Sequence, residues 1–335
     1  MSFLHRAGVL TAIAALLILP GAACADEGPG TAVSTATASS TPAATPEPDP
    51  TQAPTATPAP TATPTAEPAT AIFPFTVTGS DGKEITFEAP PERIVAIDSA
   101  VVETLFAIGE GHRLVGTHDF VSYPPEARDI PRLGGAFNLN FEATLGLDPD
   151  LVFVFSEGSV AELERLGLRV LYLQSVSDDF RKVSDNIRMW GRIVGSPDAA
   201  EAVAFSFDTR VARLERLMAG RDDGPSVFQD EGELWTPGPD TLIGEVFRLL
   251  KLQNIAHDIS GYAQLSPEVI VERSPQIVIA SYGDTMSTNP AFAELPAVKN
   301  RRIFIPEADV LSIPGPRYID GIEALAEWTY QGLFD

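Results

Sequence analysis

The sequence predicts an α/β protein made of two lobes, each built on a mostly parallel sheet, joined by one long helix. Three observations lead to this prediction. Short apolar runs alternate with helical patterns, one amphipathic stretch is longer than all others, and two halves of the chain resemble each other. With 335 residues, 44% of them hydrophobic, the chain has apolar material for about two cores.

The first lobe is predicted to begin near Phe73. Residues 75–87 alternate between apolar and polar around Asp81-Gly82, which is typical of a β-hairpin with a primed turn. Apolar runs then predict strands at 93–97, 113–116, 150–155 and 168–172. Helical patterns between and after them lie at 100–108, 141–147, 159–166 and 178–194. This alternation indicates parallel strands with helices on both faces of the sheet.

A long helix is predicted over residues 198–219. Its apolar side chains recur at steps of three and four residues: Ala200, Val203, Ala204, Phe207, Val211, Leu214 and Met218. The stripe extends over about 33 Å of helix. Ser196-Pro197 precedes it, where a helix is expected to begin. Further strands near 225–229, 276–280 and 302–305, with helices at 240–251 and from Arg317 onward, predict a second α/β lobe.

The two lobes resemble each other in one pair of segments. Residues 141–145 form a short helical pattern that opens with an acid and leads, through a proline, to the apolar run 151–153. Residues 267–271 do the same before the run 277–279, and the two segments lie 126 residues apart. The same order of elements in both lobes indicates an internal duplication.

The first 23 residues are expected to be a signal peptide. His5 and Arg6 precede an apolar run thirteen residues long, which is too short to span a bilayer, since this needs about 20 residues. Small residues then lead to Cys24, the only cysteine, which we expect to carry a lipid anchor. Gly21 departs from the branched aliphatic residue usual three positions before such a cysteine. The alternative is ordinary cleavage after Ala23-Cys24-Ala25 and release of a soluble protein.

Residues 24–72 are expected to form a tether without a folded core. Of residues 28–70, 33 are Pro, Thr or Ala, and ten of these are Pro. Such a segment has too little apolar surface to offset chain entropy and favours an extended chain that reaches about 130 Å. A long tether suits a protein held at a membrane by Cys24.

Composition and missing motifs exclude several classes of function. The net charge of −23 argues against binding nucleic acid, which requires clustered Lys and Arg. One cysteine and four histidines do not suffice for a Cys-rich zinc module or a His-rich metal site. No G-x-S-x-G, H-E-x-x-H, Walker or dinucleotide motif follows the predicted strands. We therefore expect neither an enzyme nor a resident metal.

From residue 73 the chain resembles the substrate-binding proteins of ABC importers for iron–siderophores, cobalamin and haem, also called class III or helical-backbone periplasmic binding proteins. The motifs that carry the resemblance are residues 90–95 (PPERIV), 102–109 (VETLFAIG), 123–127 (YPPEA), Gly134-Gly135, the paired segments described above, and Gly315-Pro316-Arg317. The resemblance implies Rossmann-like lobes. We divide the chain into a signal peptide (1–23), a tether (24–72), a first lobe (73–197), an interlobe helix (198–220) and a second lobe (221–335).

The resemblance also implies a function. The protein would capture a metal chelate between its lobes outside the cytoplasmic membrane and deliver it to a permease driven by an ATPase. In this family one surface acid per lobe binds the permease, and by position these acids are Glu142 and Glu268. They could equally be ordinary acids in the first turn of a helix. We expect a lipid-anchored monomer on the outer face of the membrane. The alternative is a tethered chelate sensor or scavenger without a permease.

The ligand is expected between the lobes, at the carboxyl ends of the strands. Loops there offer aromatic faces and a few polar groups, which suit a bulky chelate. Arg317 would pair either with an anionic ligand or with a carboxylate of the other lobe, and His118 is a weaker candidate for contact with a metal centre. The residues that we expect to line the cleft are Ser99, Asp119, Phe120, Tyr123, Phe137, Trp235, Tyr282 and Arg317.

Overall fold

The computed structural model describes residues 72–307 and 309–335, which lie within one compact unit. The predicted signal peptide, Cys24 and all of the predicted tether except its last residue fall outside the described residues. In the part of the chain that is described, no helix is both long enough and apolar enough to cross a bilayer.

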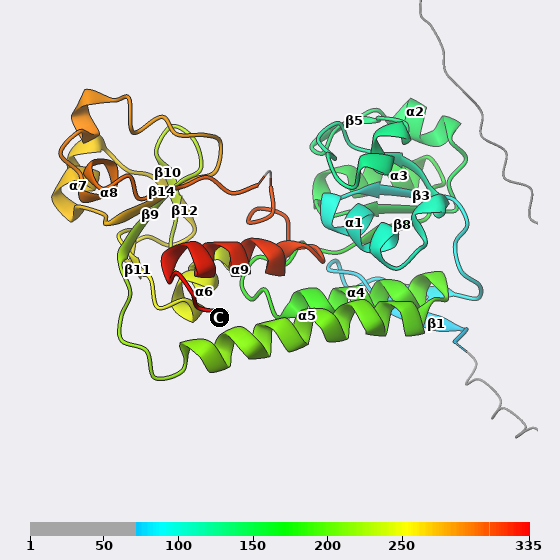
Figure 1. Ribbon diagram of the computed structural model, residues 1–335. Coiled ribbons are helices and arrows are strands. Elements are labelled where there is room, and N and C mark those ends of the chain that lie inside the picture. The colour runs from blue at the N-terminus through cyan, green and yellow to red at the C-terminus, as the bar shows by residue number, and fades with distance from the viewer. Residues whose placement is uncertain (1–71, 308) are drawn as a thin grey trace, which may run out of the picture. The chain divides into compact units, whose positions relative to one another are not determined.

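Two four-stranded parallel sheets form the two lobes, as predicted (Figure 1). The first sheet has the order β4-β3-β7-β8, and all its pairings are parallel. Its strands are β3 (Ile94–Ile97), β4 (Leu114–Thr117), β7 (Leu151–Val154) and β8 (Val170–Tyr172). The helices of this lobe are α1 (Ser99–Ala107), α2 (Phe141–Gly146), α3 (Val160–Arg165) and α4 (Lys182–Val194).

Both faces of the first sheet are covered. Along β3, Ile94 and Ala96 pack into the large apolar cluster that also holds side chains of α1 and α4. Val95 and Ile97 point the other way, into a second cluster with residues of α3. This alternation is the period of two that a strand imposes, and it confirms a sheet buried on both sides.

The hairpin of β1 (Phe75–Thr78) and β2 (Glu84–Phe87) is confirmed, but the predicted primed turn is wrong. The strands are joined by the five residues 79–83, and only Gly82 among them has a positive φ. The Asp81 carboxylate accepts a hydrogen bond from the Lys83 backbone N–H (3.2 Å) and pairs with Lys83 Nζ (3.2 Å). These local contacts stabilise a wider loop in place of the tight turn.

The long helix is α5 (Pro197–Met218), and it runs from the first lobe to the second beside α4 (Figure 1). Its buried residues are those of the predicted stripe, except that Val203 is only partly buried. Gly195 ends α4 in a left-handed conformation, with φ of 79°. A Cβ on Gly191 would lie 2.1 Å from Ala200 Cβ, so glycine allows the close approach of the two helices.

The second sheet has the order β11-β9-β13-β14 and is also parallel. Its strands are β9 (Ser226–Asp230), β11 (Gln253–Asn254), β13 (Ile277–Ala280) and β14 (Ile303–Phe304). The helices of the second lobe are α6 (Leu242–Leu249), α7 (Pro267–Arg273), α8 (Pro296–Lys299) and α9 (Tyr318–Thr329). Strands β9, β13 and β14 and helices α6, α7 and α9 occur where the sequence predicts them.

Short elements were not predicted. Two antiparallel ribbons form, β5 (Gly134–Gly135) with β6 (Asn138–Leu139), and β10 (Trp235–Pro237) with β12 (Tyr262–Gln264). Single 3₁₀ turns occupy Gly111–Arg113, Pro125–Asp129, Glu157–Ser159 and Pro290–Phe292. The strands of these two ribbons contain neither an apolar run nor an alternation long enough to indicate them.

Candidate ligand-binding cleft

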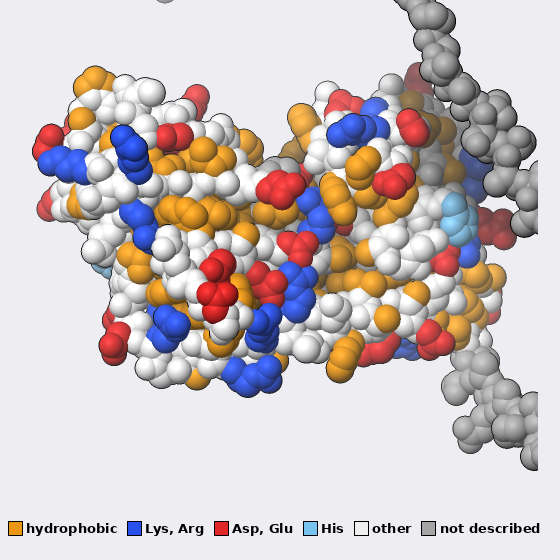
Figure 2. All heavy atoms as spheres, viewed as in Figure 1, with side chains coloured by type: hydrophobic (Ala, Val, Ile, Leu, Met, Phe, Trp, Pro, Cys, Tyr) orange, Lys and Arg blue, Asp and Glu red, His pale blue; other side chains and the backbone are white. Residues whose placement is uncertain are grey.

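A cavity of about 310 Å³ lies at the carboxyl ends of the first-lobe strands, with the second lobe on its other side. Its first-lobe wall comes from the segments that follow all four strands of the sheet. Ligands of open parallel sheets bind at this edge. Residues on its wall include Ser99, His118, Phe155 and Ser175 of the first lobe, and Leu242, Tyr262 and Ile313 of the second. Figure 2 shows a hollow between the lobes with hydrophobic side chains on both sides.

Ser99 and His118 form a hydrogen-bonded pair in this wall, joining the first turn of α1 to the loop after β4. The His118 Nδ1 accepts a hydrogen bond from the Phe120 backbone N–H (3.3 Å), so its proton lies on Nε2, which donates to Ser99 Oγ (3.1 Å). Burial, together with the nearby Arg132 charge, lowers the pKa of His118 to about 4. The imidazole is therefore neutral at physiological pH, and the protein engages both of its nitrogens.

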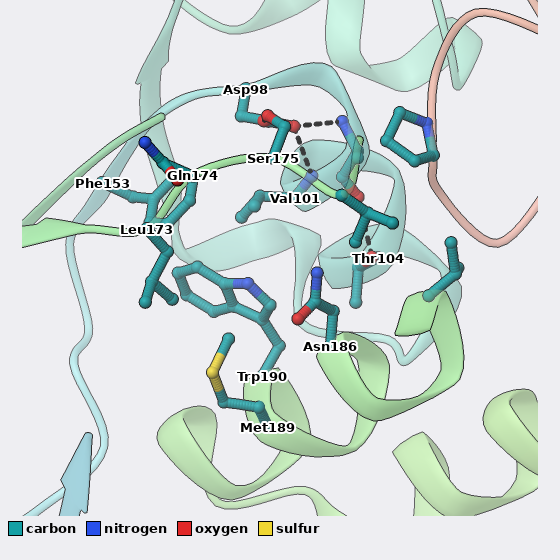
Figure 3. A pocket seen from close by; sticks show the side chains of 14 residues that line it. Asp98, Val101, Thr104, Phe153, Leu173, Gln174, Ser175, Asn186, Met189 and Trp190 are labelled. Atoms are coloured by element: carbon teal, nitrogen blue, oxygen red, sulfur yellow. Dashed lines mark hydrogen bonds between the residues drawn. The ribbon is translucent and has the colours of Figure 1, made fainter. Parts of the chain in front are cut away.

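Asp98 stabilises the same corner of the first lobe. Its Oδ1 accepts hydrogen bonds from the backbone N–H groups of Ala100 (2.7 Å) and Val101 (3.2 Å) and so caps α1. Its Oδ2 accepts from Ser175 Oγ (2.8 Å), and burial raises the pKa of the carboxyl. Beside it lies a small cavity of about 30 Å³, which has room for about one water. Figure 3 shows Asp98 on one side of this small cavity and Asn186 and Trp190 on the other.

Exposed aromatic rings follow the first-lobe strands. Phe120 is 73% exposed, and Phe137 is 80% exposed, and the Phe137 ring meets Phe155 edge-on at 5.4 Å. Asp119, between His118 and Phe120, accepts a hydrogen bond from the Gly134 N–H (3.3 Å) and so ties the two loops together. Large aromatic side chains left in water at the edge of a cavity indicate a surface that a ligand covers.

The second lobe contributes aromatic residues from the β10–β12 ribbon. Cross-strand pairs place Trp235, Tyr262 and Gln264 on one face of this ribbon, and all three are exposed. Tyr282, after β13, is 76% exposed. Tyr262 lines the cavity, yet it was not among the predicted residues, because the sequence did not indicate strand β12. A lone tyrosine after a glycine carried no signal that it faced a ligand.

Arg317 pairs with a carboxylate of the other lobe, which is the second of the two roles that the sequence left open. Its Nη2 donates to Glu103 Oε1 (2.5 Å), and its Nε donates to Glu103 Oε2 (3.1 Å), so it joins the second lobe to α1 of the first. The guanidinium also lies 3.7 Å from the centre of the Tyr123 ring. These residues line a separate hollow of about 350 Å³ with Phe106. The structure thus brings Ser99 into the cavity wall, whereas Tyr123 and Arg317 lie in the separate hollow.

The two acids expected to bind a permease are exposed in the first turns of α2 and α7. Glu142 follows the capping residue Asn140 by two positions, and Glu268 follows Ser266 by two. The pKa of Glu268 is lowered by hydrogen bonds from the backbone N–H of Glu268 and from the Ser266 hydroxyl, so this carboxylate is ionised. Within residues 72–307 and 309–335, no group of three or more His, Cys, Asp or Glu side chains is placed to hold a metal ion.

Comparison with known proteins agrees with this architecture. Residues 94–310 match the family model described as periplasmic binding protein. The chain is 27% identical over 279 residues to the uncharacterized ABC transporter substrate-binding lipoprotein YvrC of Bacillus subtilis, covering 79% of this chain and 88% of that protein.

Solved structures are similar as well. The vitamin B12 binding protein BtuF of Vibrio cholerae superposes with a TM-score of 0.64 at 27% identity, over 72% of this chain and 97% of that one. A protein of an Fe³⁺-hydroxamate transport system from Saccharomonospora viridis superposes with a TM-score of 0.65 at 25% identity, over 76% of this chain and 99% of that one. The family match covers well over half of the chain, and the two lobes have the expected topology. The chain therefore belongs to the periplasmic binding protein family.

Proposed function

We propose that this protein binds a metal chelate between its lobes outside the cytoplasmic membrane and delivers it to the permease of an ABC importer. The observation that carries the proposal is the cavity at the strand ends, with exposed aromatic rings from both lobes near it. Flat apolar faces with scattered polar groups suit a large, preformed ligand better than a small ion. The proposed cleft residues are Ser99, Asp119, Phe120, Phe137, Trp235, Tyr262 and Tyr282.

The proposed docking surface has one part on each lobe. One helical turn after Glu142, Leu145 is 44% exposed, and one turn after Glu268, Val271 is 44% exposed. Residues three positions apart lie on the same face of a helix, so each lobe offers an acid beside an aliphatic side chain. The acids would bind basic pockets on the permease, and the aliphatic residues would pack beside them. We further propose that Cys24 carries a lipid anchor and that the protein acts as a monomer.

A charge reversal tests the coupling to a permease. We expect the double variant Glu142→Arg/Glu268→Arg to lose uptake of the chelate by cells while the purified protein keeps its affinity for the chelate. Both side chains are exposed, so the substitutions leave the fold unchanged. Glu88→Arg, at another exposed acid, is the matched control and should retain uptake. Unchanged uptake in the double variant would favour a tethered sensor or scavenger.

The absorbance spectrum of protein purified from its native cells tests the ligand class, because corrinoids, haem and ferric siderophores absorb differently. A bound chromophore of one of these classes is the expected result. Protein that is purified without a chromophore, and that binds no corrinoid, haem or ferric siderophore in titration, would contradict the proposed function.

A further inference from the structure

The first-lobe wall of the cavity carries no positive charge. Among the described residues that line the cavity there is no lysine or arginine, and His118 is neutral. Arg132 lies near His118, but its Nη1 and Nη2 donate to the backbone carbonyls of His118 and Ala127 (both 3.0 Å). Arg317 is paired with Glu103. An anionic chelate would find no guanidinium or ammonium group in this wall.

The second lobe presents a carboxylate with no cationic partner among the described side chains. Glu231 directly follows β9, at the carboxyl edge of the second sheet, and its charge acts on Tyr262, which lines the cavity. Its Oε1 accepts hydrogen bonds from Gln229 Nε2 and from Ser281 Oγ (3.1 Å), both neutral groups. Burial raises the pKa of this carboxyl. A half-buried acid without an ion pair is costly unless a ligand supplies the donor.

The group of side chains around Glu231 also includes an acceptor that lacks a hydrogen-bond donor among the described residues. Burial, and after it the charge of Glu231, raises the pKa of Tyr262, which lines the cavity, and of Tyr282, which is exposed. The Oε1 of Gln229, in the same group, is buried and accepts no hydrogen bond within the described structure. A buried acceptor of this kind loses its hydrogen bond from water and gains no other in its place, at a cost of about 1–3 kcal/mol.

We propose that Glu231 selects the chelate by charge: the cleft takes a neutral or cationic metal chelate that offers N–H donors, such as amide or ammonium groups, and discriminates against polyanionic chelates. Tyr262 and Tyr282 provide aromatic faces on which such a cationic or amide group would lie. This inference rests on the proposed function, because it assumes that the cleft binds a chelate.

Binding measurements on the full chain test the selection. The probes are cyanocobalamin, which is neutral and rich in amides, ferrioxamine B, whose free amine is cationic, and haemin, whose propionates are anionic. We expect one of the first two to bind at least about tenfold more tightly than haemin, a difference of about 1.4 kcal/mol. Tighter binding of haemin would overturn the inference and leave the proposed function intact. No binding of any probe would overturn both.

The variant Glu231→Gln assigns the selection to this carboxylate. It keeps the size of the side chain and removes its charge, so we expect the ratio of affinities to shift toward haemin by about tenfold, as the loss of one nearby charge predicts. Glu233→Gln changes the net charge by the same amount at an exposed position two residues away and should leave the ratio unchanged. A ratio that is the same in both variants and in the unaltered protein would contradict the role of Glu231.

Discussion

The His118 imidazole shows how single residues set the chemistry of the cleft. A free histidine has a pKa near 6.5 and could bind a metal or change its charge at physiological pH. Here the Phe120 N–H and Ser99 Oγ engage both nitrogens, and burial lowers the pKa to about 4. The residue therefore acts as a neutral hydrogen-bonding link between α1 and the loop after β4.

We predict that His118 does not titrate between pH 5.5 and 8. The resonances of its ring, identified by their absence from the spectrum of the variant His118→Gln, should keep constant chemical shifts over this range. The control for the assignment is that all other histidine resonances persist in the variant. A midpoint near 6.5 would show that the ring is exposed to water and that the Phe120 hydrogen bond is not formed.

Other single residues show why a sequence gives only part of a site. The sequence indicated that Ser99, Phe120 and Phe137 lie in loops at the ends of strands; Ser99 follows β3 and Phe120 follows β4, whereas Phe137 lies in the turn between β5 and β6. It left the role of Arg317 open, because whether an arginine meets a ligand or a carboxylate depends on a residue more than 200 positions away, Glu103. Tyr262 was missed for a similar reason, since β12 is held by a pairing with β10 rather than by its own pattern.

At the scale of elements, the long periodic segments were predictable and the short ones were not. The helix α5 and the four-residue strands β3 and β7 have patterns that persist long enough to fix their type and their buried face. The turn at Asp81-Gly82 was mistaken because a side-chain contact of Asp81 with Lys83 decides its length. Local patterns predict elements, whereas contacts between side chains decide how they connect.

The helices α2 and α7 lead to a prediction about the docking surface. Replacing Leu145 and Val271 by serine should weaken uptake severalfold while the affinity for the chelate stays unchanged, because both side chains are exposed beside the acids that we propose bind the permease. Stability should change by no more than about 0.5 kcal/mol. Phe205→Ser on α5, 65% exposed, is the control and should not affect uptake. Normal uptake in the double variant would limit docking to the acids.

At the scale of the whole folded unit, α5 is not the only connection between the lobes. The helix itself is fixed to the second lobe by Arg210, which pairs with Asp320 (2.7 Å) and Glu323 (2.5 Å) of α9. Two further contacts join the lobes directly. On the first lobe, Ser122 Oγ donates to Asp309 (3.1 Å), and Glu103 binds Arg317. The Glu103 side chain is only 2% exposed, so this last pair is an ion pair in a low-dielectric environment.

The Glu103–Arg317 pair makes stability depend on pH. Burial raises the pKa of Glu103 to about 7, although Arg317 acts in the opposite direction. In the unfolded chain this carboxyl titrates near 4.5, so between these values the folded state binds more protons. The contribution of Glu103 to the free energy of unfolding should therefore increase as the pH falls from 8 to 5, by at most about 1.4 kcal/mol per pH unit.

Urea unfolding of the unaltered protein and of Glu103→Gln across this pH range isolates the effect. The difference in unfolding free energy between the two should grow in favour of the unaltered protein as the pH falls, because glutamine cannot take up a proton. Glu126→Gln removes an exposed acid from the wall of the same hollow and should retain the original dependence on pH. A difference that stays constant from pH 8 to 5 would mean that Glu103 remains ionised throughout, with the Arg317 pair outweighing the cost of burial.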